Sequence, residues 1–461
     1  MRPTSEGQGT IGVETLLGDP KKAIVKLSIP MIIAMVFQTA YNLVDAIWVA
    51  GLGADSLAAV GFAFPIFFAL IGLANGIGIG GSSAIARYIG RHDRRRAELA
   101  AEHALVFGVL VAVLISLPLF LFAEDIFISM GAAHTAPLAA DYGRVLFGGS
   151  LIIFVMSIMS FLLRGEGDAK RSSYIMVAGS VLNIILDPVF IYMLDLGVAG
   201  AAWATLVSFG AVTLVMLHWY FVRRDTYVRL HLLLFRLDRE IFQEVFRVGI
   251  PASVQMISMA IMQLAMNLII LMVADTDGVA VYSTGWRVIS MAIIPLQGIA
   301  SAVVPVTAAA FGAHRYDKLS VAHLFSVRFA LKIGLVVGVF ILVFAPQISL
   351  LFSWSEGSEH LAGPIAELIR INAFMVPGVA LGMLSSSTFQ GMGMGLRALV
   401  ATLLRALLLV ITFTYVLGVL LGFGLQGIWF GLLLGNLMGS VIVFSWVRLS
   451  IAHLCRQKTY V

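Results

Sequence analysis

Long apolar segments alternate with short polar connections along almost the whole chain. A helix that crosses the hydrocarbon core of a bilayer needs about 20 residues that are mostly apolar, and each of these segments reaches that length. The pattern therefore predicts an all-α integral membrane protein with twelve transmembrane helices. The expected spans are 24–50, 57–86, 97–122, 138–163, 172–194, 198–222, 241–273, 279–310, 320–345, 364–390, 396–420 and 425–448.

Basic residues concentrate on one side of these predicted spans. The connection between the second and third spans contains Arg91, Arg94, Arg95 and Arg96, whereas the connections on the opposite side are mostly acidic. Because Lys and Arg are enriched in cytoplasmic loops, we expect a multi-pass protein of the cell membrane with both termini in the cytoplasm. The expected parts are a cytoplasmic N-terminal segment (1–23), a first lobe (24–222), a cytoplasmic inter-lobe loop (223–240), a second lobe (241–448) and a cytoplasmic C-terminal tail (449–461).

The amino-acid composition agrees with a surface that faces lipid. Hydrophobic residues make up 60% of the chain and charged residues 12%, whereas a soluble domain carries about 25% charged residues. The net charge of +5 comes from basic residues in short connections beside apolar segments, which indicates membrane topology and not nucleic-acid binding. The single cysteine, Cys455, excludes an internal disulfide framework and a cysteine-based metal site.

The two halves of the chain resemble each other. The spacing between matching segments changes only from 221 residues (27 to 248) to 227 residues (197 to 424). A duplicated six-helix unit has an even number of spans, so the two lobes should be related by a pseudo-twofold axis along the membrane normal, as in many transporters. Channels and membrane enzymes can also be duplicated. The matching pairs are LSIP (27–30) with VGIP (248–251), ARYIGRH (86–92) with AAAFGAH (308–314), RGEGDAKR (164–171) with QGMGMGLR (390–397) and GVAGAAW (197–203) with GLQGIWF (424–430).

Two acidic residues, Asp45 and Asp187, lie well inside predicted spans. A carboxylate at that depth costs about 3 kcal/mol. The helical rise places both in the outer half of the bilayer, so they could face one chamber. Each acid also extends a polar helix face, because residues three, four and seven positions apart share one side of a helix. These faces consist of Gln38, Tyr41, Asn42 and Asp45 in the first span and of Ser180, Asn183 and Asp187 in the fifth.

Two carboxylates that share a poorly hydrated space do not both stay ionised without a cation. The pair can take up a proton, or it can bind Na⁺ with oxygens from Asn183 and Thr205, and the sequence leaves this choice open. Either event changes the local charge by one unit, which can shift the equilibrium between two helix arrangements. The alternative interpretation is a pair of satisfied buried acids that only stabilises helix packing.

Two prolines are candidate hinges. Pro188 directly follows Asp187 and leaves the carbonyl of Ile184 without its helical donor, and Pro30 does the same for the carbonyl of Lys26. Both prolines could equally be tolerated kinks without a function.

The second half lacks the acidic pair. Met266 and Phe413 stand at the positions that match Asp45 and Asp187. The seventh span instead carries adaptable methionine side chains, which could line a substrate cavity or belong to ordinary packing. The residues considered for such a cavity are Met259, Met262, Gln263 and Met266.

Motifs for common enzyme chemistry are absent from the sequence. It contains neither GxxxxGK[ST] nor HExxH, and its nine histidines show no metal-ligand spacing. We therefore expect no enzyme activity and no cofactor apart from a coupling ion, and a membrane enzyme is the least favoured interpretation.

Four segments carry a specific pattern: LSIPM (27–31), YNLVDAIWVAGLGADSLAAVG (41–61), LRGEGDAKRSSY (163–174) and LNIILDPVFI (182–191). Together they resemble the multidrug and toxic compound extrusion family, in its DinF-like prokaryotic branch. The resemblance implies a V-shaped pair of six-helix lobes with a central cavity that opens alternately to each side of the membrane. It also implies export of amphipathic organic cations and other drugs in exchange for Na⁺ or H⁺, and we expect a monomer.

The resemblance also assigns roles to individual residues. Tyr142, near the outer end of the fourth span, joins the polar network, and Pro30 is the residue at which the first helix bends. Ser157 and Ser160 stand where some relatives carry amides, so the coordination shell is not expected to be identical. The acids that another branch places in the second lobe are missing, which argues against a coupling site there. The implied cation site consists of Asp45, Asn183, Asp187 and Thr205.

A second function stays open, a flippase for a lipid-linked saccharide, because related folds perform it. Such proteins tend to line their cavity with basic side chains that meet a pyrophosphate. Most basic residues in or near the predicted spans lie close to span ends, which favours the antiporter over the flippase. These residues are Arg144, Arg287, Arg328, Lys332, Arg370 and Arg405.

Overall fold

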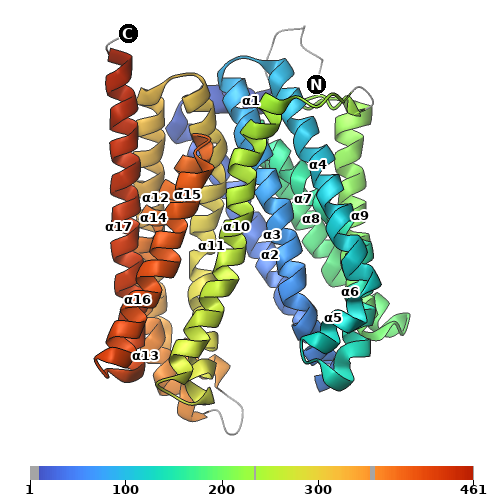
Figure 1. The fold of residues 1–461 in the computed structure, drawn as a ribbon, viewed down its shortest axis with the longest axis vertical. Coiled ribbons are helices and arrows are strands. Elements are labelled where there is room, and N and C mark those ends of the chain that lie inside the picture. The colour runs from blue at the N-terminus through green and yellow to red at the C-terminus, as the bar shows by residue number, and fades with distance from the viewer. Residues whose placement is uncertain (1–9, 233–234, 354–358, 460–461) are drawn as a thin grey trace. The chain divides into compact units, whose positions relative to one another are not determined.

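The computed structural model describes residues 10–232, 235–353 and 359–459, and within these ranges all regular secondary structure is helical (Figure 1). Helices suit a chain in lipid because their backbone donors and acceptors are satisfied within each segment. Ten helices are long and apolar enough to cross a membrane, and two bent helix pairs raise the number of spans to as many as twelve. The prediction of an all-α membrane protein is confirmed.

The first half of the chain contributes six spans. The short helices α1 (Ile11–Leu17), α5 (Ala123–Ser129) and η1 (Ala133–Thr135) flank or connect them. The spans are α2 (Pro20–Ala50), α3 (Ala54–Gly90), α4 (Arg94–Leu121), the pair α6 (Ala136–Gly148) and α7 (Ser150–Gly165), α8 (Ala169–Pro188) with η2 (Val189–Met193), and α9 (Gly197–Leu217) with η3 (His218–Arg223).

The second half repeats this order of spans. The eleventh span of the chain contains two π-helical segments, and η5 (Glu359–Leu361) precedes the tenth span. The spans are α10 (Arg239–Leu271), α11 (Thr276–Gly312), α12 (Tyr316–Phe352), the pair α13 (Ala362–Ala373) and α14 (Met375–Gly391), the series α15 (Gly395–Thr402), η6 (Leu403–Leu409), α16 (Val410–Tyr415) and η7 (Val416–Leu420), and α17 (Gly424–Thr459).

The fourth and tenth spans are broken at matching places. The fourth bends by 49° at Gly149, between α6 and α7, and the tenth bends by 50° at Phe374, between α13 and α14. Gly149 has no side chain, which lets Leu206 of α9 pack directly against the break. The sequence predicted a span at each place but did not anticipate either bend.

Turns between spans also repeat. His92 and His314 follow α3 and α11 and adopt left-handed φ angles of 58° and 54°. Gly167 and Gly393 follow α7 and α14 with φ angles of 83° and 75°. A left-handed conformation is unfavourable for a residue with a Cβ, so its recurrence at two histidines shows that the duplicated sequence also repeats its local backbone.

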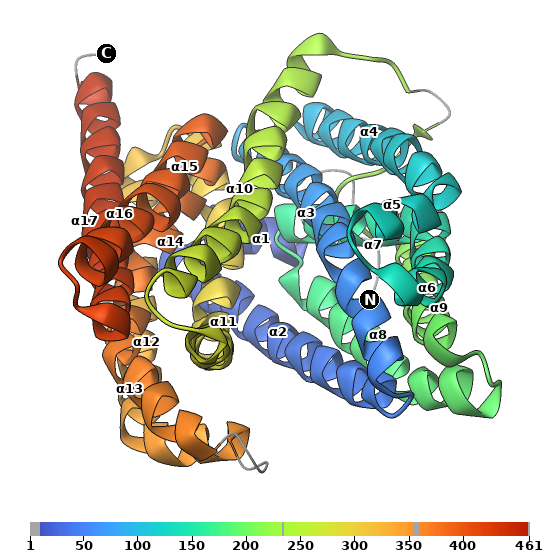
Figure 2. The same ribbon diagram turned by 60° about the horizontal axis from the view of Figure 1, so that its bottom comes forward.

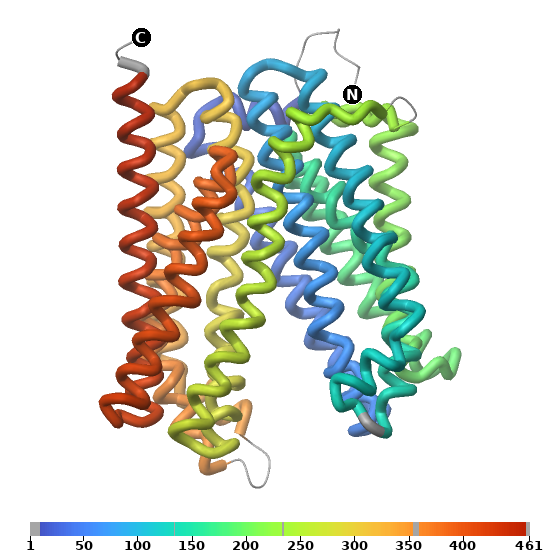
Figure 3. Tube along the Cα trace, viewed as in Figure 1, coloured from blue at the N-terminus to red at the C-terminus, as the bar shows by residue number. Residues whose placement is uncertain are grey.

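Helix packing follows the same repeat inside each half. α3 lies against α4 and α7, and α11 lies against α12 and α14, while successive spans alternate in direction (Figure 3). The second and fourth spans of each half therefore form the centre of its bundle.

The chain divides into two compact units that differ from the predicted lobes in two helices. One unit contains the described residues up to Gly18 and Ile33–Met256, and the other contains Asp19–Ile32 and the described residues from Ile257 onward. Figure 2 shows α2 and α10 each as one continuous helix. Each of them thus begins in one unit and ends in the other. Pro30 and Pro251 precede these changes of unit by a few residues.

Glycines allow the first part of each of these two helices to pack closely in the unit to which that part belongs. In the first unit, a Cβ at Gly76 of α3 would collide with Ser253 of α10. In the second unit, a Cβ at Gly298 of α11 would lie 2.5 Å from Cγ1 of Ile32 in α2. The two contacts are equivalent in the repeat, so both halves hold the exchanged helix by close glycine packing.

Candidate functional site

Helices α8 and α9 build one side of the predicted cation site. Asn183 lies one helical turn before Asp187 on α8, and both side chains are fully buried. The Asn183 Nδ2 group donates to Asp187 Oδ1 and to Thr205 Oγ1, both at 3.3 Å. Thr205, on α9, donates in turn to the carbonyl of Ala201 at 3.1 Å. The structure therefore joins Asn183, Asp187 and Thr205 in one network.

The first and fourth spans complete this cluster. Asp45 on α2 lies close enough to Asp187 for their charges to interact. The phenols of Tyr41 and Tyr142 are both 7% exposed and lie within reach of the charges of Asp45 and Asp187. Four helices of the first unit thus bring their polar side chains to one place.

Several oxygens of this cluster have no hydrogen-bond donor. Among the residues that the structure describes, Asp45 Oδ1, Asn183 Oδ1 and Asp187 Oδ2 are buried and unpaired. Unpaired buried acceptors are costly, and in a native protein they call for an ion, a proton or a water. Two carboxylates, an amide oxygen and a hydroxyl offer a set of hard oxygen ligands, and such a set suits Na⁺ or a proton.

A small cavity adjoins the cluster. Gln38, Tyr41 and Ser180 line it together with Met156, Ile175, Met176, Gly179, Phe209 and Val212, and its volume is about 30 Å³. This space is large enough for about two water molecules. The three polar residues predicted from helix spacing thus share one cavity, whereas Asn42 is exposed and does not line it.

The two predicted hinge prolines lie in different contexts. Pro30 is inside α2, which continues through it as one helix to Ala50. Pro188 ends α8 and is followed by the π-helical turn η2, one turn beyond the buried network. η2 also carries Tyr192, whose hydroxyl donates to the carbonyl of Trp48 at 2.6 Å. This link between α2 and η2 was not foreseen from the sequence.

The methionines proposed for a substrate cavity in the second half are only partly accessible. Met262 and Met266 are buried at 4% and 0% exposure, whereas Met259 is 39% exposed. Gln263 accepts a hydrogen bond from the hydroxyl of Tyr282 at 3.4 Å. Met262 and Met266 therefore contribute to packing in this structure.

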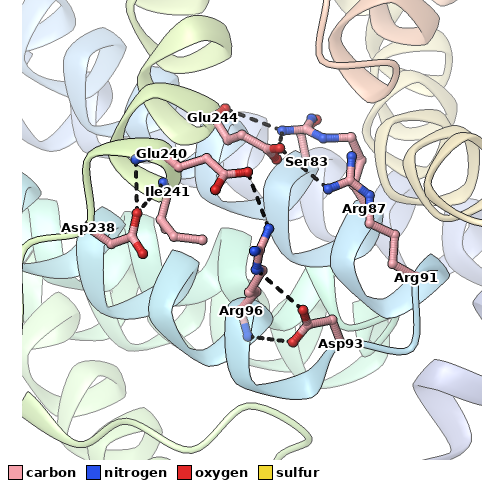
Figure 4. A network of polar contacts seen from close by, with 9 residues as sticks. All are labelled: Ser83, Arg87, Arg91, Asp93, Arg96, Asp238, Glu240, Ile241 and Glu244. Atoms are coloured by element: carbon pink, nitrogen blue, oxygen red, sulfur yellow. Dashed lines mark hydrogen bonds and ion pairs between the residues drawn. The ribbon is translucent and has the colours of Figure 1, made fainter.

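Ion pairs attach the first part of α10 to the end of α3 and to the start of α4 (Figure 4). Arg87 is 3% exposed and donates from Nη2 to Oε2 of Glu244 at 3.2 Å, and Nη1 of Arg91 lies 3.5 Å from Oε1 of the same carboxylate. Arg96 and Glu240 add a more exposed pair at 3.2 Å. The sequence interpreted the arginine cluster as a topology signal, because nothing in it showed which arginine meets an acid 157 positions away.

Glu166 is a buried acid that the sequence placed in a polar turn. Its carboxylate is 2% exposed and accepts hydrogen bonds from the hydroxyl of Tyr220 at 3.2 Å and from the backbone N–H of Val228 at 3.0 Å. Burial raises the pKa of Glu166 to about 8. The turn between α7 and α8 is thereby attached to the connection between the two halves.

A duplicated set of membrane-spanning helices with buried ionisable side chains is the architecture of a membrane transporter. Residues 30–189 and 251–416 match the MatE family model. The chain therefore belongs to the MatE family.

Relatives of known name cover nearly the whole chain. Multidrug export protein MepA of Staphylococcus saprophyticus is 26% identical over 417 residues, which is 90% of each protein. Probable multidrug resistance protein YoeA of Bacillus subtilis is 28% identical over 87% of this chain and 88% of its own length. A solved structure of a MOP superfamily transporter from Pyrococcus furiosus is 43% identical over 97% of this chain and 99% of its own, with a TM-score of 0.94.

These matches confirm the resemblance found in the four sequence motifs and the assignment as a multi-pass membrane transporter. The nature of the coupling ion, the substrates and the roles of the site residues stay predictions.

Proposed function

We propose that this protein is a secondary active antiporter that exports amphipathic or cationic drugs and other xenobiotics in exchange for Na⁺ or H⁺. The observation that carries the proposal is the set of unpaired buried oxygens at Asp45, Asn183 and Asp187. The substrate class is supported by the relatives, which are described as a multidrug export protein and a probable multidrug resistance protein.

The cluster can couple ion and drug movement through its charge. Without a cation, two neighbouring carboxylates repel each other in a poorly hydrated place. One Na⁺ or one proton removes this repulsion. Na⁺ can be coordinated by the unpaired oxygens together, and a proton on one carboxylate can be donated in a hydrogen bond to a neighbouring oxygen. A conformation that holds the cation is then favoured over one that does not, which is the requirement for driving a transition between two states.

The exchanged helices α2 and α10 provide a route for such a transition. Each belongs to both compact units, and each has a proline close to the residue where it changes unit. Asp45 lies on the part of α2 inside the first unit, so a change in its charge state acts on the same helix that enters the second. We propose alternating access of a monomer, with both termini in the cytoplasm, on this basis.

Transport by the purified protein in proteoliposomes tests the proposal. Efflux of a fluorescent organic cation should respond to an inward Na⁺ gradient or to an inward proton gradient, imposed separately, and the responding gradient identifies the ion. Asp45→Asn and Asp187→Asn should each abolish gradient-driven efflux.

Asp55→Asn is the matched control, because Asp55 is an exposed acid near the start of α3 and pairs with His134 at 3.2 Å. It makes the same chemical change outside the cluster and should transport like the parent protein. Full gradient-driven efflux by both cluster variants would show that the ion is coupled elsewhere.

A further inference from the structure

Arg405 is a buried cation in the middle of the eleventh span. It lies ten residues beyond Gly395, where the span begins, and belongs to the π-helical segment η6. At about 1.5 Å of rise per residue this is about 15 Å from the end of the span, half of a hydrocarbon core about 30 Å thick. Its side chain is 6% exposed, and π-helical segments inside spans frequently mark functional sites.

The guanidinium has only one hydrogen-bond partner among the described residues. Nη1 donates to Oδ1 of Asn436 on α17 at 2.7 Å. A guanidinium carries five N–H groups, and Asn436 is a neutral side chain that satisfies one of them. Ser440, one turn further along α17, is fully buried, and its hydroxyl has no partner in the described part of the chain.

Arg405 and Ser440 meet at the same glycine. A Cβ built on Gly382 of α14 would lie 2.5 Å from Arg405 Cδ and 2.7 Å from Ser440 Oγ. The unpaired hydroxyl is therefore beside the arginine side chain. Gly439 of α17 also packs against this arginine, since its Cβ would lie 2.8 Å from Arg405 Cγ.

In the part of the chain that the structure describes, no carboxylate pairs with Arg405. The sequence contains no Asp or Glu after Glu367. Glu367 itself binds the amide of Gln426, at 2.6 Å, near the ends of their spans. Arg87 is a useful contrast, because its equally buried guanidinium faces the carboxylate of Glu244 at 3.2 Å. An unneutralised cation at mid-membrane depth is expensive.

The surroundings of Arg405 differ from the first half in a coordinated way. Four residues that line the cavity of the first half have counterparts around Arg405, at the spacing of 226 or 227 residues that relates the halves here. The pairs are Met156 with Gly382, Gly179 with Arg405, Phe209 with Asn436 and Val212 with Gly439. Glycines stand in place of Met156 and Val212, which makes room for the arginine side chain. Asn436, which stands in place of Phe209, is the polar partner of the arginine. The same place thus holds a cavity in one half and a cation in the other.

We propose that Arg405 binds a small monovalent anion, a halide or a carboxylate, together with the Ser440 hydroxyl and the Asn436 amide N–H group. The anion neutralises the guanidinium and accepts hydrogen bonds from the guanidinium N–H groups that Asn436 does not satisfy and from the unpaired Ser440 hydroxyl. A carboxylate could come from an organic ligand and a halide from the solution. This site goes beyond the proposed cation coupling and does not depend on it.

Anion binding can be measured on the purified full-length protein in detergent. Sodium isethionate, a sulfonate that is neither a halide nor a carboxylate, is replaced by sodium chloride at constant ionic strength, and the thermal unfolding midpoint is followed by intrinsic fluorescence. A ligand that binds only the folded state raises the midpoint, so we expect a saturable rise with chloride. Arg405→Met should remove this rise.

Two further variants keep the test decisive even if Arg405→Met folds poorly. Ser440→Ala removes one donor to the anion and should raise the half-saturating chloride concentration about fivefold, the effect of one hydrogen bond. Arg397→Met makes the same chemical change on an exposed arginine of the same span and should leave the chloride response intact. An equal response in all three variants and the parent would overturn the proposal.

The source of the anion is distinguished by a second titration with sodium benzoate. Saturation at lower benzoate than chloride indicates an organic carboxylate as the ligand, and the reverse order indicates an inorganic halide. The readout is binding, so it is independent of any result on cation-driven efflux.

Discussion

The fifth and eleventh spans occupy equivalent places in the two halves, and their centres carry opposite chemistry. α8 presents Asn183 and Asp187 to a cluster of unpaired oxygens, whereas η6 presents Arg405 to a hydroxyl without a partner. The turns and the bends of the two halves remain alike. The two halves thus share the arrangement of their helices, which depends on packing. They differ in the ionisable side chains that these helices carry.

The largest expected effect comes from giving the fifth span the residues of the eleventh. Asn183 and Thr205 correspond to Leu409 and Leu432. Asn183→Leu combined with Thr205→Leu removes both neutral partners of Asp187, and losing such supporting groups lowers activity by about 100-fold. Initial rates of gradient-driven efflux in proteoliposomes measure this loss. The control Leu409→Ala alters the matching position of the other half and should retain most of the rate, so equal losses would show that the two spans do not differ in function.

A second comparison concerns the buried ion pair between Arg87 and Glu244 in the first compact unit. Arg87 and Glu244 match Ala309 and Ala23 in the repeat. Glu244→Gln leaves Arg87 buried without a counter-charge and should lower the free energy of unfolding by about 3 kcal/mol, measured by denaturant in detergent. Arg87→Met with Glu244→Met should lose less than Glu244→Gln alone, because no isolated charge remains. Glu240→Gln, which alters the exposed pair, should change stability little.

Glu166 should make stability depend on pH, whereas its equivalent in the other half, Met392, has no ionisable group. Burial raises the pKa of Glu166 from 4.5 in the unfolded chain to about 8 in the folded protein. Between pH 4.5 and pH 8 the folded state therefore binds more protons than the unfolded state. The free energy of unfolding is then greatest at the acid end of this range and falls by about 1 kcal/mol for each pH unit. Glu166→Gln should flatten this decline in unfolding midpoints measured from pH 5 to pH 8. Glu14→Gln, an exposed control, should keep the parent profile, and an unchanged slope in Glu166→Gln would mean that Glu166 is ionised throughout.

The smallest expected effect is at the link between α2 and η2. Tyr192 and Trp48 correspond to Val419 and Ile269. Valine has no hydroxyl, so it cannot donate the hydrogen bond that Tyr192 makes to the carbonyl of Trp48. Tyr192→Phe removes one partly exposed hydrogen bond and should cost about 0.5 kcal/mol. The unfolding free energy of this variant is compared with that of Tyr174→Phe, another exposed tyrosine. A loss equal to the control would show that the link adds nothing.

Much of the fold could be predicted because it depends on local composition. Apolar length predicts spans, since the bilayer excludes unpaired backbone groups, and repeated segments at a nearly constant spacing predict the duplicated unit. The bends at Gly149 and Phe374 escaped prediction, because apolar residues continue on both sides of each break. The exchange of α2 and α10 between units also escaped it, because membership of a unit depends on contacts distant in sequence.

The candidate cation site was predictable to a similar degree. The high cost of a carboxylate in lipid marks Asp45 and Asp187 in the sequence alone, and helical spacing adds Asn183, Gln38 and Ser180 to their faces. Helical spacing also suggested Asn42, which the structure leaves exposed. Spacing defines a helix face only broadly, and packing by neighbouring helices decides which of its members are covered.

The membrane class, the repeated spans and the identity of the two costly acids can be read from the sequence alone, because each follows from the chemistry of single residues in lipid. Which polar atoms lack partners depends on how the helices pack. Asp187 can be identified in the sequence as a buried acid, but whether its carboxylate oxygen has a partner depends on where α2 and α9 lie. Glu166 sat in a polar turn, and burial under the connection between the halves gave it a different acidity. Arg405 was one basic residue among several, and its isolation depends on which side chains α14 and α17 place around it.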